Sequence, residues 1–363
     1  MLTLDDRLNG VLALISNAGV DRLIVLGNGH HMIDVPNAVA HLTGYRSISP
    51  VALAIEADGR RRILAPVDDE DAVADIGWES CFTRDIRRDI GVFTGAGRIA
   101  IVGLPDAPRP LVEAFLASST ASEMDEPFYA ATAVKTFDEL AHAKRATAIA
   151  EQGYQRLLAI AQPGIRECDL AVEVNLYMRE CGANDSFLML NCGPRQDAVM
   201  PSSERVIERG DLLLCELSPS VAGQFTQICR TVCIGPAADS ASNKYPLLVA
   251  AMHEGIARVK PGARVGDVCC AIDDSLSDAG YGQYSRPPFI RRRGHGLGCG
   301  SIAPGDVSVD NDTRLESGML FMVHPNQFLP ETGYMMCGEP VICTQDGFEI
   351  LTEQKSALAS TEG

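Results

Sequence analysis

The stretch GDLLLCELSP (residues 210–219) is echoed later in the chain by GMLFMVHP (residues 318–325). In each copy a glycine precedes an apolar run, a polar residue stands six positions after the glycine, and a proline follows soon afterwards. The polar residue is Glu216 in the first copy and His324 in the second. An apolar run of this length is typical of a buried strand, so the two residues are expected at corresponding places of two related strands.

A second repeated motif supports this duplication. PGIRECD (residues 163–169) matches PGARVGD (residues 261–267), and each Pro-Gly pair follows one helical stretch and precedes another. The first long helix is expected to begin near Thr136, which has capping-box spacing to Glu139, and to end before the proline. The later chain therefore consists of two related halves, and a crevice is expected between them.

The earlier part of the chain has a different pattern. Short apolar runs typical of buried strands occur at residues 23–26, 51–56 and 99–102, and helical periodicity covers residues 8–18. Together these features predict an α+β protein with a small α/β N-terminal domain (residues 1–130) and a duplicated domain (residues 131–363).

Composition excludes several classes of protein. The net charge of −17 disfavours nucleic acid or an anionic membrane as a partner. No apolar run approaches the roughly 18 residues needed to span a bilayer, and the N-terminus lacks the features of a signal peptide. The twelve cysteines form no CxxC pair and are expected to be reduced and mostly buried. We therefore expect a cytoplasmic protein.

Polar residues within or beside apolar strands form the candidate site. In a symmetric hairpin Glu216 and Gln227 would face each other, with Cys229 on the same face as Gln227. His324 is expected to enter the crevice from the other half. The remaining candidates are His295, flanked by glycines in GHGLG (residues 294–298), and Glu339 in CGEP (residues 337–340).

Each candidate also has a plain structural interpretation. A glutamate in a strand is often an edge residue, and a histidine before proline often bonds to a turn. Cys229 or Cys299 is more often a buried, inert thiol than a nucleophile. Arg293, the last residue of the run 291–293, could clamp a substrate carboxylate or belong to a solvated charge run.

Along nearly its whole length the chain resembles the creatinase/aminopeptidase P/prolidase superfamily, which has the pita-bread fold. The matching stretches are LTGY (42–45), ATAVKTFDEL (131–140), RVIERGD (205–211), RTV (230–232) and GHGLG (294–298). The resemblance implies a prolidase-like N-terminal domain, a pita-bread catalytic domain and a homodimer.

Metallopeptidases of that superfamily bind two divalent metals through two Asp, one His and two Glu. The resemblance places the two Asp on Glu216 and Gln227 and the His on His295. It places the two Glu on His324 and on position 338, a glycine beside Glu339. Two assisting histidines fall near residues 199–200 and on position 302, which holds isoleucine. With so few carboxylates, a pair of dications would be left strongly under-neutralised.

The sequence therefore predicts a creatinase-like hydrolase or lyase that acts on a C–N bond of a small molecule without a dinuclear metal centre. Catalysis is expected from His324, His295 and Glu216. Substrate binding is expected from four further residues: Gln227, Glu339, Cys229 and Arg293. Creatine itself is a doubtful substrate, because Cys229 and the glycine at 338 lie where the creatinase-type guanidinium-binding carboxylates are expected.

Two alternatives remain open. One is a mononuclear iron or zinc enzyme or peptidase in which His295, His324 and Glu216 hold the ion. The other is a non-catalytic pita-bread module that binds proteins.

Overall fold

The computed structural model describes residues 2–300 and 302–361. Its contacts divide the chain into two compact units. The first comprises Met1–Phe137 with the short segment Cys299–Ile302, and the second comprises Asp138–Gly298 with Ala303–Gly363. The first unit extends past residue 130 because Thr136 bridges Leu2, and the amide of Phe137 donates to the Leu2 carbonyl at 3.1 Å.

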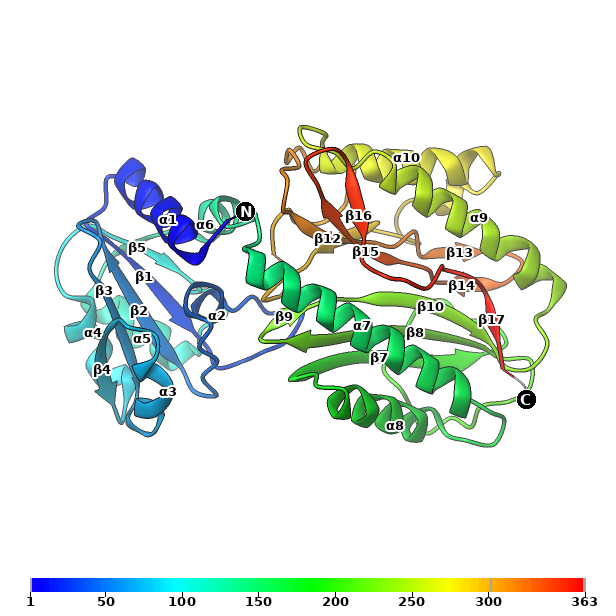
Figure 1. The fold of residues 1–363 in the computed structure, drawn as a ribbon, viewed down its shortest axis with the longest axis horizontal. Coiled ribbons are helices and arrows are strands. Elements are labelled where there is room, and N and C mark those ends of the chain that lie inside the picture. The colour runs from blue at the N-terminus through cyan, green and yellow to red at the C-terminus, as the bar shows by residue number, and fades with distance from the viewer. Residues whose placement is uncertain (1, 301, 362–363) are drawn as a thin grey trace. The chain divides into compact units, whose positions relative to one another are not determined.

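The first unit is an α/β fold on a six-stranded sheet with the strand order β4-β3-β2-β1-β5-β6 (Figure 1). Strand β1 runs parallel to β5 and antiparallel to β2, whereas β3 and β4 run parallel. The elements are α1 (Leu4–Ala18), β1 (Arg22–Gly27), α2 (Ala38–Thr43), β2 (Val51–Glu56), β3 (Arg61–Pro66), a 3₁₀ turn (Val67–Asp69), α3 (Glu70–Ala74), β4 (Glu79–Thr83), α4 (Ile86–Thr94), β5 (Ile99–Val102), α5 (Arg109–Ser118), β6 (Ala121–Glu123) and α6 (Asp125–Ala131).

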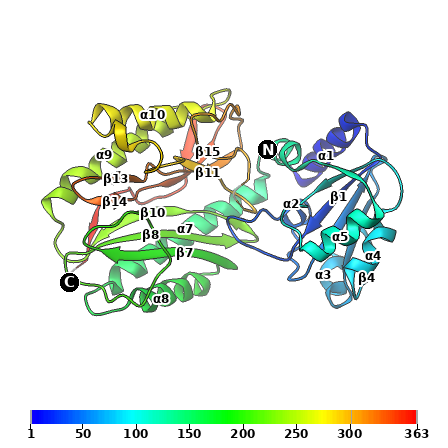
Figure 2. The same ribbon diagram turned by 180° about the vertical axis from the view of Figure 1, so that it is seen from behind.

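Helices cover both faces of this sheet, as the uninterrupted apolar strands require. Leu23 and Val25 of β1 pack into the core that contains α1, α2, α3 and α6. The intervening Ile24 and Leu26 pack against α4 and α5 on the other face (Figure 2).

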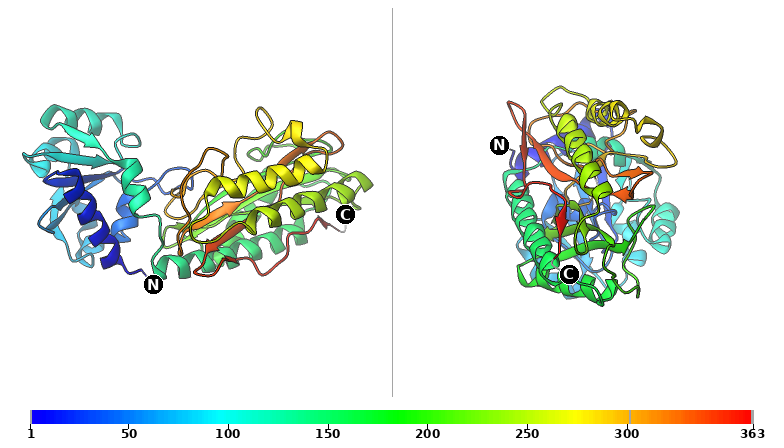
Figure 3. Two further views of the ribbon diagram at one scale, coloured as in Figure 1. Left: turned by 90° about the horizontal axis from the view of Figure 1, so that it is seen from above. Right: turned by 90° about the vertical axis from the view of Figure 1, so that its right-hand side faces the viewer.

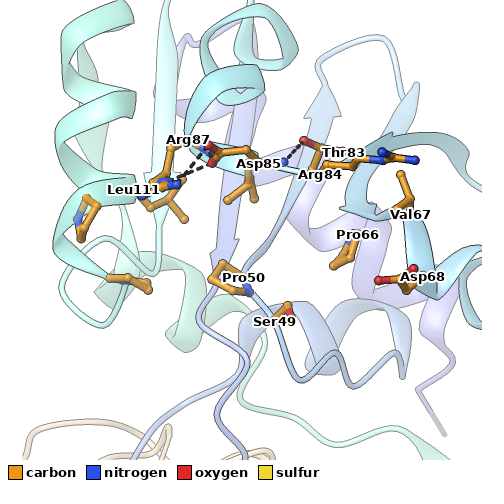
Figure 4. Close-up of a pocket in the computed structure, with 13 residues that line it drawn as sticks. Ser49, Pro50, Pro66, Val67, Asp68, Thr83, Arg84, Asp85, Arg87 and Leu111 are labelled. Carbon is orange, nitrogen blue, oxygen red and sulfur yellow. Dashed lines mark hydrogen bonds and ion pairs between the residues drawn. The ribbon is translucent and has the colours of Figure 1, made fainter.

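A cavity of about 630 Å³ lies at the carboxyl ends of β3 and β4 (Figure 4). After β3 the chain continues to α3 on one face of the sheet, and after β4 it continues to α4 on the other face. Ligands of α/β sheets often bind where neighbouring strands connect to opposite faces in this way. Two of its charged side chains neutralise each other, since Arg87 pairs with Asp85 through both carboxylate oxygens at 2.9 and 3.0 Å. None of the residues expected to carry chemistry lines this cavity.

The second unit contains three sheets and two pairs of helices. A five-stranded sheet has the order β17-β10-β8-β7 with β9 on β8, a four-stranded sheet has the order β11-β12-β15-β16, and β13 pairs with β14. The elements are α7 (Phe137–Ile160), α8 (Glu167–Glu180), β7 (Asp185–Gly193), β8 (Leu212–Val221), β9 (Gln224–Phe225), β10 (Ile228–Cys233), α9 (Asp239–Ile256), α10 (Val265–Asp278), a 3₁₀ turn (Gly282–Tyr284), β11 (Gly294–Gly296), β12 (Leu320–Val323), β13 (Gln327–Leu329), β14 (Gly333–Met335), β15 (Glu339–Cys343), β16 (Phe348–Ile350) and β17 (Ala359–Ser360).

The duplication expected from the sequence is confirmed in this unit. Each half consists of a helix, a Pro-Gly turn, a second helix and strands, and α9 runs alongside α10 (Figure 3). Equivalent backbone bonds recur: the amide of Gly164 donates to the Ile207 carbonyl at 2.9 Å, and the amide of Gly262 donates to Leu315 at 2.8 Å. The α+β class and the duplicated C-terminal domain were therefore predicted correctly.

The register expected for the β8 hairpin was wrong by two residues. Glu216 pairs with Cys229 instead of Gln227, because the turn is centred on Ala222 and Gly223, one residue later than expected. Both turn residues have positive φ, 48° and 82°, as in the two-residue turns that match strand twist. A slip of two residues preserves the face of a strand, so Gln227 remains a diagonal neighbour of Glu216.

Among the residues that the structure describes, no helix has both the length and the apolar character needed to cross a membrane.

Candidate active site

Glu216 projects from β8 on the side of the sheet away from the helices. Its neighbours Cys215 and Leu217 belong to the apolar core beneath α7 and α8, so Glu216 between them points to the opposite side. Its carboxylate accepts from Nε2 of Gln227 at 3.4 Å and lies 3.8 Å from Sγ of Cys229. The structure therefore brings these three predicted site residues together.

Gln227 links Glu216 to His295. The His295 ring places Nε2 3.0 Å from Oε1 of Gln227 and Nδ1 2.9 Å from the carbonyl oxygen of Gly296. In this orientation of the amide, Nε2 of His295 donates to Oε1 of Gln227. Reversing the amide would turn its oxygen toward the Glu216 carboxylate, placing two acceptors together. Gln227 thus bridges the His295 imidazole and the Glu216 carboxylate.

The glycine before His295 is required by the close approach of β11 to β12. Gly294 has a φ of 150°, and a Cβ atom there would lie 1.8 Å from the carbonyl oxygen of Met322. Any larger residue would separate the two strands and move His295 away from Gln227.

His324 follows β12 and enters the same site. Its ring centroid lies 5.6 Å from that of His295. The side chain is buried, and its Nδ1 has no hydrogen-bond partner among the described residues. Burial, followed by the charges of His295 and Arg292, holds the pKa of His324 well below its ordinary value of 6.5. At neutral pH the ring is therefore a neutral imidazole whose Nδ1 is uncommitted.

Gly338 lies directly against His324. A Cβ atom at position 338 would lie 2.7 Å from Cβ of His324 and 2.5 Å from Cε of Met322. A side chain at 338 therefore cannot be accommodated unless His324 moves. The position of the His324 side chain therefore requires a glycine at 338.

Glu339, expected to bind substrate, is bonded to the protein itself. Its Oε1 lies 3.0 Å from a guanidinium nitrogen of Arg230, and its Oε2 accepts from Thr352 at 2.6 Å. Ser356 donates a further bond. Both partners of the ion pair are buried, and they join β10 to β15 across the two halves. These contacts favour a structural role, and substrate binding by Glu339 stays a prediction.

Arg293 is likewise held within the fold. Its guanidinium lies 2.7 Å from Oδ1 of Asp273 and donates to the Asn326 carbonyl and to Oε1 of Gln327, each at 3.0 Å. Only 1% of the residue is exposed. The neighbouring Arg292 pairs with Asp306 at 2.7 Å. The contacts of Arg293 are those of a buried scaffold residue, so its proposed contact with substrate remains untested.

Cys229 fits the interpretation as a buried, inert thiol. Desolvation and the adjacent Glu216 carboxylate raise its pKa well above the ordinary value, so the protonated form prevails. Its S–H points toward the carboxylate, where a thiolate would be repelled. Cys299 is also buried and belongs to the first unit.

Three further polar atoms in this region were missed from the sequence. The hydroxyl oxygens of Ser218 and Ser220 and Oδ1 of Asn326 are buried and have no hydrogen-bond partner among the described residues. Ser218 stands two residues after Glu216, and Asn326 stands two residues after His324. The duplication itself was therefore the signal that could have found them.

The two-unit architecture is similar to that of solved structures. The structure resembles prolidase from Pyrococcus horikoshii, with a TM-score of 0.86 and 18% identity over 97% of this chain and 99% of that chain. It also resembles Xaa-Pro dipeptidase from Bacillus anthracis, with a TM-score of 0.84 and 22% identity over 99% of this chain and 100% of that chain. These similarities show the fold: a small N-terminal domain followed by a pita-bread domain.

Sequence similarity identifies the family. Residues 141–345 match the model of metallopeptidase family M24, and the chain belongs to that family. The chain is 29% identical to an uncharacterized peptidase of Bacillus subtilis, YqhT, over 228 residues. That match covers 62% of this chain and 64% of the relative, which is less than two thirds of its length. An Xaa-Pro dipeptidase of Pyrococcus furiosus is 24% identical over 68% of this chain and 72% of its own length.

Proposed function

We propose that the chain is a hydrolase or lyase that cleaves a C–N bond of a small molecule by imidazole acid–base catalysis, without a dinuclear metal centre. The observation that carries this proposal is the buried, neutral His324 beside His295, with its Nδ1 left without a hydrogen-bond partner among the described residues. A buried polar atom without a partner is unfavourable unless a ligand or water satisfies it.

The donor set does not fit the metal pair of the superfamily that the chain resembles. Among the five corresponding positions, only Glu216 supplies a carboxylate, because Gln227 is neutral and position 338 has no side chain. Two dications would leave three uncompensated positive charges in a buried site, which is strongly unfavourable. The close packing of Gly338 against His324 also leaves no room for the missing glutamate.

The imidazoles offer a route for the proton instead. Hydrolysis of a C–N bond adds the oxygen of water to carbon and a proton to nitrogen. Neutral His324 is suited to accept the proton of the attacking water at Nδ1 and to return it to the departing nitrogen. Glu216 and His295, connected through Gln227, present polar groups that orient a polar substrate. In a lyase the same base would take its proton from carbon.

A single-metal site of two imidazoles and one carboxylate is the second candidate, although the ligand atoms of these three side chains do not all lie within 4.8 Å of one another. His295, His324 and Glu216 would be the ligands of one iron or zinc ion. The bond between Nε2 of His295 and Oε1 of Gln227 would have to break first, because that nitrogen must be deprotonated to bind a metal. This requirement ranks the single-metal site second.

A substrate screen tests the proposal. Purified protein, with and without EDTA, is incubated with small amides, amidines and Xaa-Pro dipeptides, and amine release is measured. We expect turnover that survives EDTA and falls about 100-fold or more in His324→Ala. The matched control is His253→Ala, because His253 is an exposed histidine of α9. Normal turnover in His324→Ala, or activity that depends on added metal, would overturn the proposal.

A homodimer is also proposed, on the resemblance of the whole chain to the superfamily. Light scattering on the full chain measures its mass. A monomer at micromolar concentration would contradict this expectation.

A further inference from the structure

Several buried polar atoms of the second unit lack hydrogen-bond partners among the described residues, and four of them lie at equivalent positions of the two halves. Ser218 and Ser220 follow Glu216 along β8, and Asn326 and His324 occupy the corresponding stretch after β12. Ser218 is 0% exposed and Asn326 is 2% exposed, so bulk water does not compensate for the missing bonds.

The register places Ser218 in the candidate site. It shares the face of Glu216, because alternate residues of a strand point to the same side. The pairing of β8 with β9 and β10 sets Ser218 across from Gln227, whose amide contacts both Glu216 and His295.

Asn326 is connected to the same residues from the other half. Its side chain lies beside Tyr334, a half-buried tyrosine whose pKa is raised first by burial and then by the nearby Glu216 carboxylate. Oδ1 of Asn326 has no hydrogen-bond partner among the described residues, and this oxygen can only accept a bond.

We propose that Ser218 and Asn326 are positioning residues that hold an amide-type substrate between the two halves of the second unit. The serine hydroxyl donates to the carbonyl oxygen of the substrate, and Oδ1 of Asn326 accepts an N–H of the same group. This inference rests on the proposed function and names its substrate class: a compact molecule with an N–C=O unit that presents an acceptor on one side and a donor on the other.

The combination of Ser218 and Asn326 also orients the substrate. A serine hydroxyl donates, whereas the free oxygen of the asparagine side chain only accepts. The two halves therefore offer different chemistry although their folds are equivalent. The N–H end of the substrate is directed to the half that carries His324, the residue proposed to protonate the departing nitrogen.

The test uses the full chain with N-acetylglycinamide as the probe, measured by saturation-transfer NMR. Wild type should bind it more tightly than its fully N-methylated analogue, which cannot donate to Asn326. Ser218→Ala and Asn326→Leu should each weaken binding about tenfold, as expected for the loss of one buried hydrogen bond. Tyr334→Phe, which keeps Oδ1 of Asn326, should retain binding and serves as the control if Asn326→Leu does not fold.

Unfolding in urea provides a second readout that needs no ligand. Ser218→Ala removes an unbonded hydroxyl, so its midpoint should be equal to or above that of wild type. The matched control is Thr147→Val, because the Thr147 hydroxyl is bonded to that of Thr226 at 2.8 Å. This variant should unfold at lower urea while binding the probe normally.

Three results would overturn the inference: no binding of N-acetylglycinamide by wild type, unchanged binding by Ser218→Ala, or a lower urea midpoint for Ser218→Ala. Failure of the proposed function is separate, since it would appear as probe binding without C–N cleavage of any substrate in the screen.

Discussion

Replacing Glu339 by glutamine is expected to destabilise the second unit by about 3–5 kcal/mol. The substitution keeps the size of the side chain and removes its charge, so Arg230 is left buried without a counter-ion. Arg230 is 2% exposed, and its remaining partners are the carbonyl oxygens of Cys229 and Gly338, at 2.9 and 2.7 Å. Because these two bonds persist, we expect the loss to fall near the lower end of that range.

The measurement is urea unfolding followed by two signals. The single tryptophan, Trp78, lies in the first unit, so its fluorescence reports that unit, whereas far-UV circular dichroism reports both. Glu339→Gln should shift the circular dichroism transition and leave the tryptophan transition in place. The double variant Arg230→Met/Glu339→Leu should recover most of the stability, since it removes both charges together.

One result would refute this reasoning: a free energy of unfolding for Glu339→Gln within about 0.5 kcal/mol of wild type, the usual range for a surface substitution. Glu339 would then be dispensable for the fold and available for substrate binding, as the sequence suggested.

Three further predictions concern the candidate site. His324→Gln should make the free energy of unfolding depend less on pH below 6.5. Because the pKa of His324 is below 6.5 in the folded protein, the unfolded chain binds more protons as the pH falls. In urea titrations the free energy of unfolding of wild type should therefore fall by up to about 1.4 kcal/mol per pH unit below 6.5. Gly338→Ala should cost about 1–3 kcal/mol by overpacking and should also lower turnover, because the new Cβ displaces His324; equal stability and turnover would refute this. Cys229 should resist iodoacetamide at pH 8 in the native protein, whereas the half-buried Cys168 should be modified, as read by peptide mass spectrometry.

The overall fold was accessible from the sequence because its strongest signals are local and repeated. Two Pro-Gly turns, two glycine-led apolar runs and their common order predicted two equivalent halves, and backbone bonds at Gly164 and Gly262 confirm them. The register of the β8 hairpin was less accessible. It depends on which two residues take up positive φ, and Ala222 carries no sequence signal for that conformation.

The candidate site was partly predictable for a similar reason. Periodicity brought Glu216 and Gln227 to one face, and the duplication brought His324 opposite them. The partners of Arg293 and Glu339 were not predictable, because buried ion pairs form between residues distant in the sequence. Asn326 was overlooked because an asparagine after a proline usually marks a turn, and its distinguishing feature is a buried Oδ1 that has no hydrogen-bond partner among the described residues.

The metal content of the active protein tests the central claim most directly. Full-length protein purified without chelator is analysed by inductively coupled plasma mass spectrometry, and its turnover is measured on the same sample before and after EDTA. We predict metal well below one ion per chain and unchanged turnover. Two ions per chain, lost with activity under EDTA and regained together with it, would contradict acid–base catalysis by the two histidines.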